Sequence, residues 1–416
     1  HFRQEVMGGV TNFLTILYII IVNPVILNCF GKGFPINPSI TATILLIVIM
    51  TTMASLVIKL PFVIAPGMGM NAMVSFTMIL HDKMPIPIAL GVIFWSSCIL
   101  LLFSISNLRQ KIINVIPESI QIALSVGIGL FLILIGVKNA GIIISNPETL
   151  LTIHKVNYII LLSFFGFILA TVLFIRRKNY AFILPIIVVT LLGFLDQKTV
   201  FPKHFYAFPD FSLFWSIDFI HSFRLSLLPA ILSLFLINFF DATSSVIGLI
   251  SQLDAKSQKN KNNYYKNALV VDATAGIVSG LVGTSPGAVF VESSAGIQNG
   301  AKTGFASLVT AVLCIPFLFL APIVSIVPSY ATSPILILVG MLMMTHLRKI
   351  DLKHMEDFIA TILTIIMMPL AFSITAGAVF GIISYTILKI LVGKYHELNK
   401  GLLVVAICCI GWFFII

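Results

Sequence analysis

Residues 284–300, TSPGAVFVESSAGIQNG, interrupt an apolar region in a way that few folds accommodate. Pro286 prevents a straight helix, the apolar run 287–291 predicts a short strand, and the polar residues from Glu292 onward suit a helix N-terminus. A similar break occurs at 61–71, PFVIAPGMGMN. Inside a bilayer, irregular backbone persists only where protein or a water-filled cavity satisfies it. Two such breaks, one in each half of the chain, indicate the substrate site of a membrane transporter.

The composition agrees with a membrane location. Of the 416 residues, 59% are hydrophobic and only 10% are charged, whereas soluble domains carry about 25% charged residues. The net charge of +10 is spread over short loops between apolar segments, so we expect no nucleic-acid partner. The cysteines have no metal-ligand spacing, and we expect neither a metal nor a cofactor; they are Cys29, Cys98, Cys314, Cys408 and Cys409.

Apolar segments of membrane length recur along the chain in two sets of seven. The first set is expected at about 10–28, 38–58, 62–80, 86–106, 117–137, 157–175 and 180–195, and the second at 227–250, 267–283, 285–299, 304–321, 331–346, 357–371 and 374–392. The interrupted segment is third in each set, and an odd number of spans per repeat inverts the second repeat relative to the first. Residues 196–225 are aromatic-rich and suit the membrane interface, whereas the apolar piece 402–416 has no place in this scheme.

The lysines and arginines predict the orientation. If the N-terminus is cytoplasmic, the opposite side holds only Lys32, Lys83, Lys138, Lys155, Lys198, Lys203 and Arg224, and the cytoplasmic side holds the other 18 of 25. An excess of cations in cytoplasmic loops is the usual arrangement. We therefore expect a multi-pass protein of the inner (plasma) membrane with a cytoplasmic N-terminus.

Charged groups inside apolar spans are costly and tend to mark function. Asp241 and Glu292 are the two candidates, and both are expected to take part in proton coupling as well as in substrate binding. Asn238 precedes Asp241 by three residues, which places the two side chains on one helix face. The alternative for this face is a hydrogen-bonded cluster between helices.

Glu292 is expected at a helix N-terminus, where the helix dipole favours an anion while burial disfavours the charged form. A carboxylate balanced in this way can exchange a proton or accept N–H groups of a heterocycle; the alternative is a helix cap. Asn71 opens the other half-helix and offers a donor and an acceptor. Phe290 could lie against a flat ring or pack in the core. Asp272 is either interfacial or part of the following span.

The segment Gly283-Thr-Ser285-Pro-Gly287 matches the G-x-S-x-G pattern of serine hydrolases. That pattern requires a soluble α/β context and a histidine placed to complete a triad. The downstream histidines, His346, His354 and His396, fall in expected loops. We therefore expect a transporter and not an enzyme.

Several motifs together resemble one known family. They are Glu5-Val-Met-Gly-Gly-Val-Thr11, Ala65-Pro66-Gly67-Met68-Gly69-Met70-Asn71-Ala72, Phe240-Asp241, Val291-Glu292-Ser293-Ser294-Ala295-Gly296, Lys302-Thr303-Gly304 and Thr332-x-Pro334. The chain resembles the AzgA-like adenine/guanine/hypoxanthine permeases, which are related to the xanthine/uracil/ascorbate permeases (nucleobase–cation symporters). The resemblance covers almost the whole chain.

The resemblance implies an all-α polytopic fold of about 14 transmembrane segments in 7+7 inverted repeats, in which spans 3 and 10 are a short β-strand plus a half-helix. It implies a core domain formed by residues 1–106 and 226–325, and a gate domain formed by residues 107–225 and 326–416. The substrate would lie between spans 3, 8 and 10, with Asn71, Asp241 and Glu292 as binding residues. Proton coupling is expected, and relatives often form homodimers.

The chain also departs from the family pattern. Asn238 replaces an aspartate, and Pro286–Val289 replace a threonine-rich run. The leading hypothesis is proton symport of purines (hypoxanthine, guanine or adenine) by movement of the core against the gate. Alternatives are a sulfate-like anion transporter on the same fold, or a permease for another flat heterocycle such as xanthine or uracil. Sodium coupling and an ion channel are further alternatives.

Overall fold

The computed structural model describes residues 2–106, 117–146, 150–194, 205–250, 252–253, 261–349 and 354–413. Within these ranges the chain is mostly helical, and eight helices are long and apolar enough to cross a membrane. Predicted features that fall partly or wholly outside the described residues include several of the lysines and arginines used for the orientation (among them Lys198 and Lys203), the beginning of the 196–225 connection, and the end of the 402–416 piece.

The first half of the chain contains one interrupted region, β1 followed by a short helix, and a surface hairpin. Its elements are α1 (Phe2–Leu27), α2 (Ile36–Val57), β1 (Ile64–Pro66), α3 (Met68–Ala72), the π-helix η2 (Met73–His81), α4 (Ile86–Ile105), α6 (Glu118–Asn139), β2 (Ile143–Asn146), β3 (Leu150–Ile153), α7 (Tyr158–Ile175) and α8 (Ile183–Gly193). The antiparallel pair β2–β3 lies in the region 138–156, where the sequence analysis expected only a loop.

The second half repeats the order of helix, strand and short helix. Its elements are α9 (Leu228–Ile250), α11 (Lys261–Val282), β4 (Gly287–Val289), α12 (Ser293–Gln298), α13 (Gly304–Cys314), α14 (Ala321–Val324), α15 (Ser329–Met344), α16 (Met355–Leu370), α17 (Ile374–Leu391) and α18 (Lys400–Phe413). The expected helix at 304–321 is broken after Cys314, where Pro316 starts a 3₁₀ turn. The apolar piece near the C-terminus is α18, which packs against α17 and α9.

Prolines set the beginnings of several long helices. Pro35, Pro85, Pro117 and Pro328 each occupy the position before a helix, with φ between −55° and −77° and extended ψ. The proline ring fixes φ, and the missing N–H is no loss where the first helical N–H groups have no partner in the helix. These four positions end the preceding loops and start α2, α4, α6 and α15.

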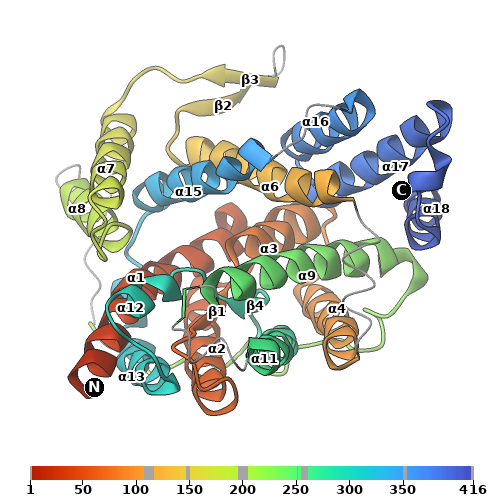
Figure 1. The fold of residues 1–416 in the computed structure, drawn as a ribbon. Coiled ribbons are helices and arrows are strands. Elements are labelled where there is room, and N and C mark those ends of the chain that lie inside the picture. The colour runs from red at the N-terminus through yellow and green to blue at the C-terminus, as the bar shows by residue number, and fades with distance from the viewer. Residues whose placement is uncertain are drawn as a thin grey trace.

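The helices form two groups that meet along one face (Figure 1). One group contains α6, α7, α8, α15, α16 and α17, which pack mainly on one another; the other contains α1, α2, α4, α9, α11 and α13. Strands β1 and β4 lie side by side within the second group, although about half of the chain separates them in sequence.

Side chains close the boundary between the groups. A Cβ added to Gly69 of α3 would lie 3.0 Å from Ile128 of α6, so the two helices approach closely there. Nearby, Phe76 of η2, Phe131 of α6 and Phe372 pack edge-on, with ring centroids 5.3 to 6.1 Å apart. The short helix α3, which follows β1, is therefore placed directly against the helix group that contains α6.

Candidate functional site

The centre of the candidate site is the antiparallel pair β1–β4. Ile64 pairs with Val289, Ala65 with Ala288 and Pro66 with Gly287. Two further backbone bonds extend the pairing at its ends, from Gly67 N to Pro286 O (3.0 Å) and from Phe290 N to Val63 O (2.9 Å). Each strand ends where a short helix begins, so both helix starts are fixed by the same ladder.

Side chains of the flanking helices satisfy the outer edges of this strand pair. Thr51 of α2 accepts from Ile64 N and donates to Ile64 O, both at 3.1 Å. On the other edge, Asp272 of α11 accepts from Val289 N at 2.7 Å, and Ser279 accepts from Gly287 N at 2.8 Å. Without such partners, two three-residue strands would leave several buried backbone groups unpaired.

Asp272 is therefore not interfacial. It is fully buried, and its Oδ1 holds the backbone of β4 three residues before Glu292. From the sequence alone both placements are open, because a position near the start of a span suits a membrane surface as well as a core. A carboxylate eleven residues into α11, with apolar neighbours on both sides, was the available signal.

Glu292 stands at the N-cap position of α12, as the sequence predicts, but its side chain makes no cap hydrogen bond. Its Oε1 instead accepts a hydrogen bond from Tyr18 Oη of α1 at 3.2 Å. The helix-cap alternative therefore does not describe what this carboxylate does in the structure. The sequence analysis does not identify Tyr18 as a partner of Glu292, because a tyrosine within a long apolar helix resembles a packing residue.

Asp241 approaches the same strand pair from α9. Its Oδ2 lies 3.8 Å from the position that a Cβ of Gly67 would occupy, and that position is 3.9 Å from Ala288. The structure thus brings Asp241 to the strand pair beside Gly67 and Ala288, where the methyl group of Met70 also lies, while Glu292 follows the end of β4 by three residues.

Asn71 is fully buried in α3, and a second asparagine holds it. Its Nδ2 donates to Asn23 Oδ1 at 3.1 Å, while its own Oδ1 has no hydrogen-bond partner among the described residues. Asn23 of α1 also donates to Thr43 and Thr284 and accepts from Ser285. We refer to Asn23 and these four partners as the Asn23 node. Its members are all fully buried, so the node fixes which way Asn71 points.

The other two predicted residues lie in different surroundings. Phe290 is 6% exposed and belongs to the main apolar core. Asn238 is 2% exposed, and its Nδ2 lies 3.7 Å from the position of a Cβ on Gly276, so it faces α11. Its Oδ1 has no hydrogen-bond partner in the described part of the chain.

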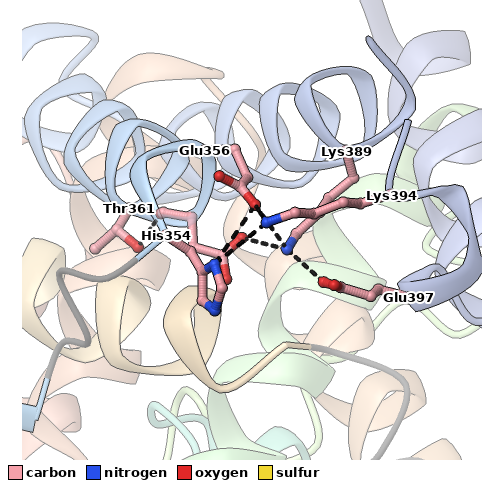
Figure 2. A network of polar contacts seen from close by, with 7 residues as sticks. His354, Glu356, Thr361, Lys389, Lys394 and Glu397 are labelled. Atoms are coloured by element: carbon pink, nitrogen blue, oxygen red, sulfur yellow. Dashed lines mark hydrogen bonds and ion pairs between the residues drawn. The ribbon is translucent and has the colours of Figure 1, made fainter. Parts of the chain in front are cut away.

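A second polar cluster lies away from the strand pair, where α16, α17 and the turn after α17 meet (Figure 2). Lys389 contacts Glu356 at 3.3 Å, Asp357 at 2.9 Å and Glu397, while Lys394 contacts Glu356 at 2.6 Å. The hydrogen bond from Lys394 lowers the pKa of Glu356 to about 2. Two lysines and three carboxylates from α16, α17 and the following turn share these contacts, so the cluster ties the helix ends together.

The described residues contain no group of three or more His, Cys, Asp or Glu side chains placed to hold a metal ion. What the geometry does provide is a pair of carboxylates and a buried amide around a short strand pair, within a bundle of apolar helices. This arrangement defines the class as a polytopic membrane transporter. The chain belongs to the permease family, because the profile described as "Permease family" matches residues 3–380.

Known permeases are similar over almost the whole chain. The adenine permease AdeP of Escherichia coli is 34% identical over 407 residues, which cover 97% of this chain and 91% of AdeP. The guanine/hypoxanthine permease PbuG of Bacillus subtilis is 34% identical over 422 residues, which cover 98% of this chain and 96% of PbuG. These relatives are transporters, so the expectation of a transporter rather than an enzyme is confirmed.

Solved structures show the same fold. The transmembrane domain of the cyanobacterial bicarbonate transporter BicA has a TM-score of 0.65 at 17% identity, covering 90% of this chain and 97% of that domain. Murine SLC26A9, an anion transporter in the inward-facing state, has a TM-score of 0.64 at 9% identity, covering 95% of this chain and 69% of SLC26A9. At these identities the likeness concerns the fold alone.

Proposed function

We propose that this protein imports purine nucleobases by proton symport, at the site between β1, β4 and the two carboxylates. The observation that carries the proposal is the placement of Glu292 and Asp241 beside one short strand pair inside an apolar bundle. Purines present N–H donors and ring acceptors along their edges, and a carboxylate is an acceptor when ionised. The permeases AdeP and PbuG, named for adenine and for guanine and hypoxanthine, support this class of substrate.

Within the site, Glu292 accepts from an N–H edge of the base, and Asp241 binds the opposite edge or carries the coupled proton. Asn71 Oδ1 supplies a further acceptor, since its Nδ2 is already occupied by Asn23. Backbone groups at the strand ends complete the hydrogen bonds. Phe290 and Asn238 lie behind this first layer and shape it through packing and the position of α9.

The arrangement of the chain in the membrane is part of the proposal. Fourteen spans in two inverted repeats agree with the parallel roles of α2 and α11, each second in its half, which satisfy the edges of β1 and β4. Residues 1–106 and 226–325 form the core, and residues 107–225 and 326–416 the gate. The protein lies in the inner membrane with a cytoplasmic N-terminus and forms a homodimer.

A sulfate-like anion transporter is the second candidate, since BicA and SLC26A9 share the fold. Two carboxylates at the site oppose it, because an anion there would face like charges. Xanthine or uracil remains a candidate substrate because Asn238 and Pro286–Val289 depart from the family pattern. An uptake experiment distinguishes all of these.

The test uses cells that lack their own nucleobase permeases and express this protein. Radiolabelled adenine, guanine, hypoxanthine, xanthine and uracil are supplied with and without a protonophore, and excess sulfate is added as a competitor. We expect protonophore-sensitive uptake of at least one purine and no effect of sulfate. Uptake of no base, or competition by sulfate, contradicts the proposal.

A further inference from the structure

Tyr18 of α1 contacts both the candidate substrate site and the helix group that contains α7 and α8. Its hydroxyl donates to Glu292 Oε1 at 3.2 Å, and its ring lies 4.9 Å from the ring of Phe182, which precedes α8. Phe182 in turn contacts Phe174 of α7, with ring centroids 5.9 Å apart. Tyr18 has no exposed surface, so both contacts are made within the protein.

The two ends of this side chain have different physical effects. At the hydroxyl end, a donor on Oε1 restricts the orientation of the carboxylate. Hydrogen bonds to a charged group are stronger than those between neutral groups, particularly away from water. At the ring end, an aromatic pair adds attraction beyond the burial of its area, so the contact resists separation of α1 from α8.

We propose that Tyr18 is a positioning residue for transport: its hydroxyl orients Glu292 toward the substrate, and its ring couples that carboxylate to the helix group containing α7 and α8. This inference rests on the proposed function. In this role Tyr18 does not itself touch the substrate but sets the direction in which Glu292 presents its carboxylate. The contact between the rings of Tyr18 and Phe182 must then loosen when the two helix groups move.

Two substitutions separate the two effects. Tyr18→Phe removes the hydroxyl and keeps the ring, so we expect the KM for the transported purine to rise about tenfold or more with Vmax within about twofold. Phe182→Leu removes the ring contact and keeps the hydroxyl, so we expect Vmax to change with KM nearly unaltered. Tyr158→Phe is the matched control, because the Tyr158 hydroxyl donates to Leu192 O of α8 at 3.1 Å and not to Glu292.

The experiment measures initial uptake of whichever purine the wild type imports, at equal amounts of protein in the membrane. Failure of the wild type to import any purine overturns the proposed function, whereas the Tyr18 inference is judged only against an active wild type. A wild-type KM for Tyr18→Phe, or a KM raised equally by Tyr158→Phe, overturns the inference.

A lower amount of folded Tyr18→Phe protein would still allow the role of the hydroxyl to be tested. The Kd of the purified protein for the same labelled purine, measured by scintillation proximity, does not depend on the folded fraction. A Kd raised about tenfold or more supports the role of the hydroxyl. A Kd equal to that of the wild type contradicts it.

Discussion

Replacing Asn23 by leucine is expected to destabilise the protein by about 2 to 3 kcal/mol. Asn23 makes four side-chain hydrogen bonds, at 2.8 Å to Thr43, 3.0 Å to Thr284, 3.1 Å to Asn71 and 2.8 Å to Ser285. Hydrogen bonds between membrane helices contribute about 0.6 kcal/mol each on average, so four contribute about 2.4 kcal/mol. Leucine has the same number and branching of side-chain heavy atoms as asparagine and a larger volume, so the substitution leaves no cavity.

The assay is reversible unfolding of the purified protein in mixed micelles, with Thr43→Val as the control. Thr43→Val removes one of the four bonds of Asn23; the Thr43 hydroxyl is also bonded to Ser39 O at 2.7 Å within its own helix and lies 3.4 Å from the Thr284 hydroxyl. We expect a loss of about 0.6 kcal/mol for the control. If Asn23→Leu costs no more than Thr43→Val, the Asn23 node is not a unit and the reasoning is refuted.

Three further predictions follow from other contacts. Asp272→Ala leaves Val289 N unpaired and should lower the free energy of unfolding by about 1 to 3 kcal/mol in the same assay. Asp272→Asn keeps an acceptor and should lower it by less. Equal losses would contradict the role of Oδ1. Gly340→Val should strongly reduce the amount of folded protein measured by size exclusion, because the new Cβ would lie 2.5 Å from Gly129 O. Gly141→Asn is the control: this position has φ +73° and open space around it, so the substitution should be tolerated. The pKa of Glu356 is lowered from 4.5 to about 2, so its ion pairs stabilise the protein above pH 4.5, and this contribution should disappear as the pH falls from 4.5 to about 2. Glu356→Gln should therefore make the melting temperature less sensitive to pH in that range. A melting temperature with the same pH dependence as the wild type would argue against the cluster.

Local chemistry allowed the two interrupted regions to be predicted from sequence. Pro66 and Pro286 stop helices, and the apolar residues beside them suit short strands, so a strand followed by a short helix was expected in both places. Asp241 and Glu292 were predictable because a carboxylate in an apolar segment is costly without a role. Their meeting at one strand pair also followed, through the resemblance to a known family.

The partners of these groups could not be predicted in the same way. Tyr18 lies more than 270 residues from Glu292 in sequence, and no pattern in its own segment indicates that its hydroxyl meets that carboxylate. The same holds for Thr51, whose hydroxyl satisfies β1, because a threonine in an apolar helix more often bonds its own backbone. The hairpin β2–β3 was missed because its short apolar strands lack a regular alternation.

The central claim is that a base binds between β1 and β4 with Glu292 as its acceptor and that protons drive its import. The most direct test is uptake of labelled purine by proteoliposomes containing the purified protein, with the outside made more acidic than the inside. We expect the wild type to accumulate adenine, guanine or hypoxanthine only while the pH gradient lasts, and Glu292→Gln, at equal folded amount, to lose at least about tenfold of this uptake. Accumulation by Glu292→Gln at the wild-type rate, or wild-type accumulation that ignores the gradient, would contradict the account.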